Sequence, residues 1–223
     1  LEFTCQNGVV QIKGDSDFKE FNDDVITIET DNPSDVIREL VLKNKSPKID
    51  YLPPFTGGFV GYFAYDYIKY AEPSLNLDAE NQDQFKDIDL MLFDKVIAFD
   101  HVKQKIILIV NMPLENVEVE YNKAVMELEH LVELLRNGKK KEETGGKLLG
   151  EVTPLFEKKE YCSMVEKAKH HIHEGDIFQI VLSNRLSAPF EGSLLNTYRV
   201  LRTINPSPYM FYFSGTDVEV AGA

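Results

Sequence analysis

Residues 57–63 are Gly57-Gly58-Phe59-Val60-Gly61-Tyr62-Phe63, an aromatic stretch that contains three glycines. Aromatic and β-branched residues favour strands, and a glycine within a strand either lets another backbone pack closely or marks a bulge. A phosphate-binding loop is the alternative interpretation. It is disfavoured because the stretch lacks the G-x-G-x-x-G order, and neither Lys-Ser nor Lys-Thr follows it. We therefore predict that residues 57–63 form a strand whose glycines permit close backbone packing or a bulge.

The residues before this strand predict a hairpin and a helix. The segment Phe3–Ile12 surrounds Asn7-Gly8, the pair that most readily takes positive φ in a tight turn. A helix opens at Asn32-Pro33-Ser34, where Ser34 is the expected cap, although the position of Pro33 also fits. The apolar face of that helix comprises Val36, Ile37, Leu40 and Val41.

The residues after the strand predict a second hairpin and a long helix. Two β-rich runs lie between Leu90 and Val110, and the polar residues 100–105 join them through a four- or five-residue loop. The helix ends at Asn137-Gly138, where we expect glycine in a left-handed C-cap. Its apolar residues follow one another at steps of three and four, which places them on one face: Val117, Tyr121, Val125, Leu128, Val132 and Leu135.

The second part of the chain follows a linker. Residues 139–152 combine a lysine-glutamate run with glycines and show no periodicity, so we place a domain boundary there. Beyond it, residues 161–172 predict a helix that Gly175 closes, and Ser193 caps another. Between them, Ile177–Leu186 alternates and predicts a strand. Last, the runs Tyr209–Phe213 and Val218–Ala221 predict a hairpin.

Charge and composition exclude several classes of protein. The 223 residues include 24 Lys and Arg against 37 Asp and Glu, which gives a net charge of −13. An acidic surface repels phosphate backbones and anionic lipids, so we expect neither a nucleic-acid nor a membrane partner. Cys5 and Cys162 lie too far apart to suggest a metal or disulfide framework. We interpret Cys162 as a small buried hydrophobe in a reduced, cytoplasmic protein.

Two clusters suggest metal binding, and each has a simpler interpretation. His170-His171-x-His173-Glu174 could share an ion, but histidines in a last helical turn also favour the negative end of the helix dipole. We prefer that second interpretation. Asp15-Ser16-Asp17 resembles the start of a calcium loop, but Gly is absent from the sixth position and Glu from the twelfth. A surface turn is expected there.

A third cluster lies on the polar face of the strand predicted at Ile177–Leu186. It comprises Gln179, Ser183 and Arg185. An arginine beside an amide and a hydroxyl is suited to bind a carboxylate, so this face is a candidate polar cleft. The alternative is an ordinary exposed strand face. The sequence by itself assembles no nucleophile–base pair.

One segment resembles a known family. Asn205-Pro206-Ser207-Pro208-Tyr209-Met210-Phe211-Tyr212 is similar to a motif of anthranilate synthase component I, the chorismate-converting subunit of tryptophan biosynthesis. The segments Gly175–Ser183 and Phe55–Phe63 agree with the family in order and spacing. Aminodeoxychorismate and isochorismate synthases share those two segments but generally lack Ser-Pro-Tyr-Met, and this favours anthranilate synthase.

The resemblance implies an α+β fold, a two-sheet sandwich with outer helices. Residues 1–138 would be the N-terminal regulatory region, 139–152 the linker, and 153–223 the start of the chorismate-binding region. We expect the chain to be the N-terminal part of a longer protein, truncated before its catalytic C-terminal half. No catalytic or metal-ligating residue of the family can then be placed in this chain, and the ligands of Mg²⁺ are expected beyond Ala223.

The resemblance also implies a function. Pro208, Tyr209 and Met210 would line an allosteric pocket for L-tryptophan, the feedback inhibitor. The intact subunit would convert chorismate and ammonia to anthranilate and pyruvate, with ammonia supplied by a glutamine amidotransferase partner. Two alternatives stay open: aminodeoxychorismate synthase component I, and a non-catalytic module that binds an amino acid or serves as an adaptor.

Overall fold

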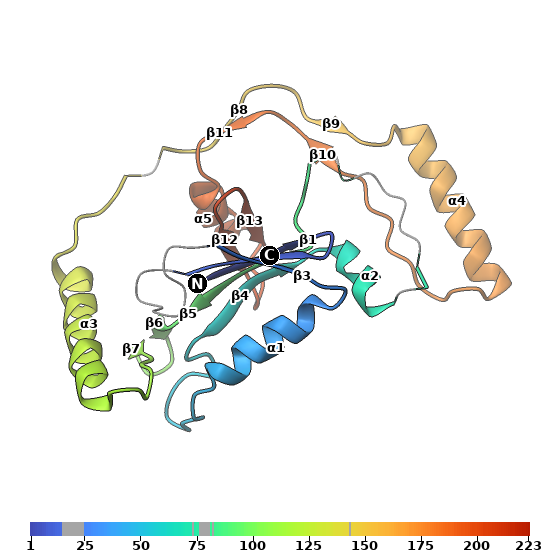
Figure 1. Cartoon of the computed structure of the whole chain (residues 1–223). Coiled ribbons are helices and arrows are strands. Elements are labelled where there is room, and N and C mark those ends of the chain that lie inside the picture. The colour runs from blue at the N-terminus through green and yellow to red at the C-terminus, as the bar shows by residue number, and fades with distance from the viewer. Residues whose placement is uncertain (15–24, 73, 76–80, 82, 143) are drawn as a thin grey trace. The chain divides into compact units, whose positions relative to one another are not determined.

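The computed structural model describes residues 1–14, 25–72, 74–75, 81, 83–142 and 144–223 (Figure 1). These residues form two compact units, unit 1 (residues 1–140) and unit 2 (residues 141–223). The segment Asp15-Ser16-Asp17, considered above as a calcium loop, lies outside the described residues.

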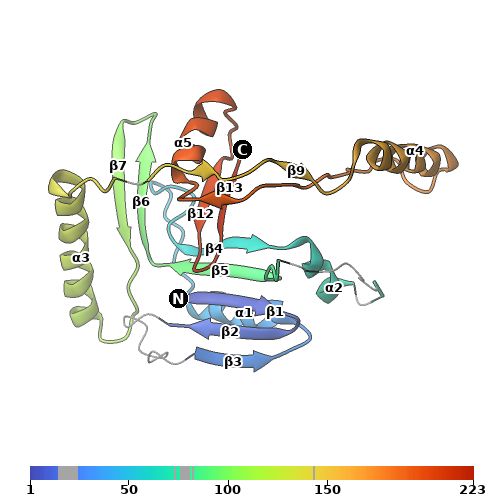
Figure 2. The same ribbon diagram turned by 90° about the horizontal axis from the view of Figure 1, so that it is seen from above.

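Unit 1 is built on an antiparallel sheet with the strand order β3-β2-β1-β5-β4 (Figure 2). The turn between β1 and β2 is Asn7-Gly8, with φ of 50° and 79°, so the predicted hairpin is confirmed. The strands are β1 (Glu2–Gln6), β2 (Val9–Lys13), β3 (Val25–Glu29), β4 (Gly58–Phe63) and β5 (Ile88–Phe93).

The core of unit 1 lies on the face of this sheet that helix α1 (Pro33–Lys43) covers (Figure 1). Phe3 stands opposite Ile12 on one side and Leu90 on the other. Because side chains alternate along a strand, such rows point to one face and exclude water together. The buried cluster comprises Phe3, Cys5, Val10, Ile12, Leu40, Ile88 and Leu90, with Val36 and Ile37 of α1 packed against it.

Helix α1 starts two residues earlier than a Ser34 cap would place it. Asn32 is the N-cap and Pro33 is the first helical residue. Proline suits that position because its fixed φ is already helical and its missing N–H would have had no partner within the helix. The Ser34 hydroxyl instead donates to the side-chain oxygen of Asn32 at 2.6 Å.

The glycines near β4 explain why the strand has its composition. A Cβ atom on Gly61 would overlap the carbonyl oxygen of Asp89 and come within 2.8 Å of the Cα atom of Leu90 on β5. Gly57 has φ of +146°, and a Cβ there would lie 2.6 Å from the side-chain nitrogen of Asn111. That nitrogen donates to the carbonyl of Thr56 at 2.7 Å. The expected close packing is therefore confirmed.

The second predicted hairpin is correct in part. The region from 88 to 110 holds three strands, because the first β-rich run divides at Asp94 into β5 and β6 (Lys95–Asp100). β5 joins the large sheet, while β6 pairs with β7 (Lys105–Val110) across a four-residue connection. Hydrophobicity alone did not distinguish one long strand from two that belong to different sheets.

Helix α3 (Val117–Asn137) packs against β7 and ends where the sequence predicted. Gly138 does not take the left-handed C-cap, however, because its φ is −60° and its ψ 139°. The chain leaves the helix in an extended conformation instead. The described part of unit 1 also contains two short elements, a 3₁₀ turn η1 (Tyr65–Tyr67) and helix α2 (Ile68–Ala71).

The described residues of unit 2 form two helices and three short antiparallel strand pairs. The first pairs are β8 (Lys147–Leu148) with β11 (Phe190–Glu191), and β9 (Thr153–Pro154) with β10 (Leu186–Ser187). Helix α4 (Lys158–Glu174) closes at Gly175 with φ of 83°, which confirms the predicted glycine stop. Cys162 on α4 is exposed, which contradicts our interpretation of it as a buried hydrophobe.

The C-terminal part of unit 2 contains helix α5 (Leu195–Ile204) and the hairpin β12 (Phe211–Ser214) with β13 (Glu219–Gly222). The hairpin is confirmed, but β12 begins at Phe211, so Tyr209 and Met210 lie in the preceding loop. The N-cap of α5 is Leu194 rather than Ser193. The Ser193 hydroxyl still accepts the Leu195 N–H at 3.1 Å.

The strand predicted at Ile177–Leu186 is wrong. Residues 177–185 form no strand in the described chain, and only Leu186 enters a short pair. Side chains hold the segment instead, since the Tyr161 hydroxyl donates to the Leu182 carbonyl at 3.0 Å. Asn184 also bonds the backbone of Phe156 through both its amide nitrogen and its oxygen, each at 3.0 Å. An alternating sequence pattern indicates which side chains share a face, but it does not show that a neighbouring strand is available for pairing.

Candidate functional site

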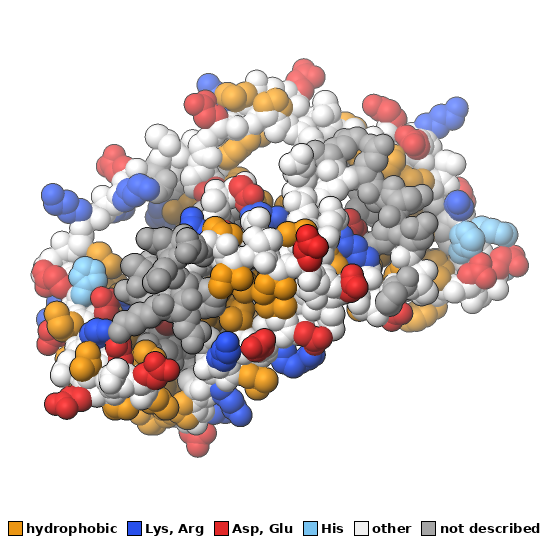
Figure 3. All heavy atoms as spheres, in the orientation of Figure 1, with side chains coloured by type: hydrophobic (Ala, Val, Ile, Leu, Met, Phe, Trp, Pro, Cys, Tyr) orange, Lys and Arg blue, Asp and Glu red, His pale blue; other side chains and the backbone are white. Residues whose placement is uncertain are grey.

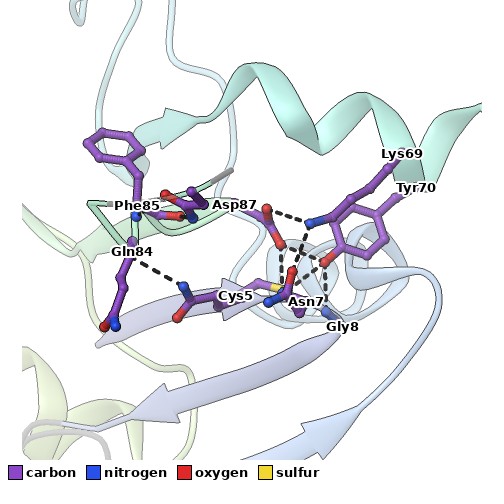
Figure 4. Close-up of polar contacts among 10 residues, drawn as sticks. Cys5, Asn7, Gly8, Lys69, Tyr70, Gln84, Phe85 and Asp87 are labelled. Carbon is purple, nitrogen blue, oxygen red and sulfur yellow. Dashed lines mark hydrogen bonds and ion pairs between the residues drawn. The ribbon is translucent and has the colours of Figure 1, made fainter. Parts of the chain in front are cut away.

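A polar cluster in unit 1 joins three segments that are far apart in the sequence. Asp87 lies directly before β5 and is 4% exposed. Its Oδ1 atom pairs with the Lys69 ammonium group at 2.8 Å, and its Oδ2 atom accepts the Tyr70 hydroxyl and the Asn7 N–H, each at 2.7 Å (Figure 4). The Tyr70 oxygen in turn accepts the Gly8 N–H at 2.7 Å. We call Asn7, Gly8, Lys69, Tyr70 and Asp87 the Asp87 cluster.

Electrostatics around Asp87 favour a charged carboxylate and a neutral Tyr70 hydroxyl and Cys5 thiol. Burial opposes ionisation of Asp87, but bonds from Lys69, Tyr70 and Asn7 outweigh it and hold its pKa below the usual value. Burial, followed by the hydrogen bond to Asp87, raises the pKa of Tyr70. Burial likewise raises the pKa of the Cys5 thiol, whose sulfur lies 3.8 Å from the Tyr70 oxygen. Cys5 is therefore unsuited to act as a nucleophile.

An open pocket of about 560 Å³ lies beside this cluster. Its lining is polar and comprises Gln6, Asn7, Asp66, Lys69, Asn81, Gln84 and Asp87. Asp87 and Lys69 bond each other, and Lys69 also bonds Asn7 in the β1–β2 turn. We therefore interpret these two charged groups as stabilising the fold. The cluster fixes α2 and the start of β5 to the β1–β2 turn.

The residues expected to bind tryptophan lie together in the loop between α5 and β12. Tyr209 is 89% exposed and Pro208 is exposed, while Met210 is partly buried. The Tyr209 N–H donates to the Ser207 hydroxyl at 3.4 Å, a local contact within the loop. The loop thus presents an aromatic ring and a thioether next to each other, which are groups suited to an apolar ring.

The candidate polar cleft is not assembled. Gln179, Ser183 and Arg185 are all exposed, and the strand that was to align them on one face is absent from the described residues. Their role as a carboxylate-binding face stays a prediction.

The histidine cluster lies at the end of α4, where Figure 3 shows the histidine side chains next to acidic ones at the surface. His171 Nδ1 lies 2.8 Å from the Asp176 carboxylate. The described part of the chain contains no group of three or more His, Cys, Asp or Glu side chains that could hold a metal ion.

The sequence did not predict the Asp87 cluster. It also did not predict a group of hydrogen bonds around Glu219 in unit 2, which is described below. Asn7, Tyr70 and Asp87 show no local motif, since their hydrogen bonds join residues up to 80 positions apart. Strand register brings them together, and a single sequence does not reveal register between distant strands. The one available signal was Asp87 itself, an acidic residue directly before a strongly apolar strand.

The chain belongs to the family of chorismate-binding enzymes, because that family's model matches residues 7–223. The individual relatives are more specific. Anthranilate synthase component 1 from Acetivibrio thermocellus is 36% identical over 206 residues, which are 86% of this chain and 40% of that protein. The protein of the same name from Aquifex aeolicus (strain VF5) is 38% identical over 207 residues, 87% of this chain and 40% of its own length.

A solved structure agrees with these relatives. Anthranilate synthase component I from Streptococcus pneumoniae TIGR4 matches with a TM-score of 0.71 and 27% identity, over 100% of this chain and 47% of that chain. The expected α+β fold of this type is therefore confirmed. The chain spans about two fifths of the length of the two relatives above. Within the described residues, no helix has the length and apolar character needed to cross a membrane.

Proposed function

We propose that this chain is part of the large subunit of an anthranilate synthase. The observation that carries the proposal is Ser207-Pro208-Tyr209-Met210, which occurs in a chorismate-binding chain whose relatives named above are anthranilate synthase components. In this proposal the intact subunit converts chorismate and ammonia to anthranilate, pyruvate and water. A glutamine amidotransferase partner releases the ammonia, and the protein works in the cytoplasm.

The proposed reaction has two steps. The nitrogen of ammonia bonds to the ring while the ring hydroxyl leaves as water. The ether bond to the enolpyruvyl group then breaks as a ring proton is lost, so that the ring becomes aromatic and pyruvate departs. We assign no step to a metal held by this part of the chain, because the ligands of Mg²⁺ are expected beyond Ala223.

Regulation is the part of the proposal that involves residues of this chain. Pro208 and Met210 provide apolar walls for the indole of L-tryptophan, and Tyr209 adds an aromatic surface. The exposure of Tyr209 supports this role, because a ring that is 89% exposed in unit 2 is accessible to a ligand. Bound tryptophan lowers activity by favouring a less active state of the intact enzyme.

The test uses the intact protein that contains this chain. Met210→Thr is expected to raise the tryptophan concentration for half-inhibition by about tenfold, since burying a methionine side chain contributes roughly 1.5–3 kcal/mol. Anthranilate fluorescence at increasing tryptophan measures this. Met126→Thr is the matched control, because Met126 is 68% exposed on α3. Identical inhibition curves for Met210→Thr and the parent protein would remove Met210 from the pocket.

Product analysis distinguishes the two alternatives. An aminodeoxychorismate synthase would release aminodeoxychorismate and show no response to tryptophan. A non-catalytic module would bind an amino acid or a partner protein without consuming chorismate. Residues 1–223 alone are expected to give no anthranilate from chorismate, ammonia and Mg²⁺, and fluorescence from that mixture would contradict our assignment of catalysis to the rest of the protein.

A further inference from the structure

A group of partly buried hydrogen bonds joins helix α5 to the β12–β13 hairpin in unit 2. Glu219, the first residue of β13, accepts the Leu194 N–H at 2.6 Å through Oε2. Its Oε1 atom accepts the Tyr212 hydroxyl at 2.8 Å and the Ser193 hydroxyl at 3.2 Å. One carboxylate thus connects the start of the helix with both strands of the hairpin. We call Ser193, Leu194, Tyr212 and Glu219 the Glu219 clamp.

The clamp is stronger than ordinary surface contacts because its acceptor is charged. Hydrogen bonds to a carboxylate are shorter and stronger than bonds between neutral groups. The Leu194 N–H, followed by the Tyr212 hydroxyl, holds the pKa of Glu219 below its usual value, so the group stays ionised at neutral pH. A negative charge at the start of α5 also suits the helix dipole.

The geometry connects this clamp to the loop that carries Pro208, Tyr209 and Met210. Helix α5 and strand β12 flank residues 205–210, one on each side in the sequence. The rings of Tyr198 and Tyr212 also pack with centroids 5.9 Å apart, which fixes the helix against the strand. The contacts described within the loop are local, so its placement follows from the placement of its two ends.

We propose that Glu219 is a positioning residue for tryptophan inhibition: it sets α5 against β12 and so holds loop 205–210 in the conformation that binds the inhibitor. This inference rests on the proposed function. Glu219 acts through the loop, since its carboxylate is occupied by the helix and the hairpin.

The experiment measures inhibition and substrate kinetics in parallel on the intact protein. Glu219→Ala is expected to raise the tryptophan concentration for half-inhibition about tenfold, a typical coupling between linked sites. The KM for chorismate is expected to change less than twofold. Glu219→Gln is expected to restore most of the inhibition, because an amide oxygen still accepts one or two of the bonds. A merely structural role would change KM, kcat and thermal stability together.

Tyr212→Phe keeps the test decisive where Glu219→Ala does not fold. It removes one donor to Glu219 and preserves the ring contact with Tyr198, so we expect a rise of about threefold in the half-inhibiting concentration. Suppose that tryptophan inhibits the parent protein, and that the inhibition curves are unchanged for Tyr212→Phe and for every Glu219 variant that folds. That result would overturn this inference and leave the proposed function standing. A parent protein that makes anthranilate but ignores tryptophan would overturn the proposed regulation and this inference with it.

Discussion

The sheet of unit 1 and the segment 177–185 of unit 2 have similar sequence patterns but different structures. Phe3 on β1 is 0% exposed, whereas Phe178 is 92% exposed. Both belong to runs in which apolar and polar residues alternate. β1 has β2 on one side and β5 on the other, and α1 covers its apolar face. In the described residues, the segment 177–185 has no paired strand.

This difference shows what an alternating pattern specifies. The pattern determines which side chains share a face, and the rest of the chain must supply the strands and helices that cover it. Unit 1 contains its own cover. For 177–185, no strand among the described residues pairs with it, and the chain spans about 40% of the length of the two relatives named above. Burial is therefore the property that separates the two regions experimentally.

The largest expected effect comes from the core of unit 1. Phe3→Ala removes a ring that touches the rows from β2 and β5, and it leaves a cavity that the sheet cannot close. We expect a loss of about 3–5 kcal/mol in the free energy of unfolding of unit 1. Urea unfolding followed by circular dichroism measures the loss. An unchanged midpoint would show that the core is not where the structure places it.

The Asp87 cluster should give an intermediate effect. Asp87→Asn removes the charge that Lys69, Tyr70 and Asn7 share, and we expect a loss of about 1–3 kcal/mol at neutral pH. Asp66→Asn is the matched control, since Asp66 lines the same pocket without belonging to the cluster. The loss should appear in urea unfolding of Asp87→Asn and not of Asp66→Asn.

The difference in stability between the parent protein and Asp87→Asn should depend on pH. The folded state lowers the pKa of Asp87, so its charge stabilises the fold above the usual aspartate pKa, near pH 4. That contribution is lost as the pH falls through the lower, folded value. The difference in stability between the parent and Asp87→Asn should therefore shrink as acid is added below about pH 4. A difference that stays constant down to pH 2 would contradict the role of the charge.

The smallest effect is expected for the exposed segment. Phe178→Ser in residues 1–223 should change the free energy of unfolding by less than about 0.5 kcal/mol, because the ring makes little contact there. The same substitution in the intact protein tests whether further chain covers the segment. A loss of more than about 2 kcal/mol there would show a ring buried by other residues, and equal small effects would show that 177–185 stays exposed.

Much of unit 1 was predictable because its signals are local. The Asn7-Gly8 turn, the apolar face of α1 and the glycines of β4 each act through neighbours in the sequence or through one adjacent strand. The division of residues 88–110 between two sheets was not predictable in this way. Both β5 and β6 are apolar, but β5 pairs with β1, more than 80 positions away, whereas β6 pairs with the nearby β7.

The role of the candidate tryptophan site stays a prediction, and the arrangement of its residues was not predictable from the sequence. Resemblance identified Pro208, Tyr209 and Met210, and the structure places them in one accessible loop rather than in a strand. The resemblance gave no indication of Glu219. Its partners Ser193 and Tyr212 come together with it only when the hairpin packs against α5. Side-chain contacts between distant segments depend on tertiary packing, which no periodicity encodes.

The central claim is that these residues belong to a tryptophan-regulated anthranilate synthase. Its most direct test is the fluorescence of anthranilate formed by the intact protein from chorismate and ammonia, with and without L-tryptophan. We predict anthranilate as the product, inhibition by tryptophan in the parent protein, and inhibition weakened about tenfold in Met210→Thr. Aminodeoxychorismate as the product, together with no response to tryptophan, would contradict the claim.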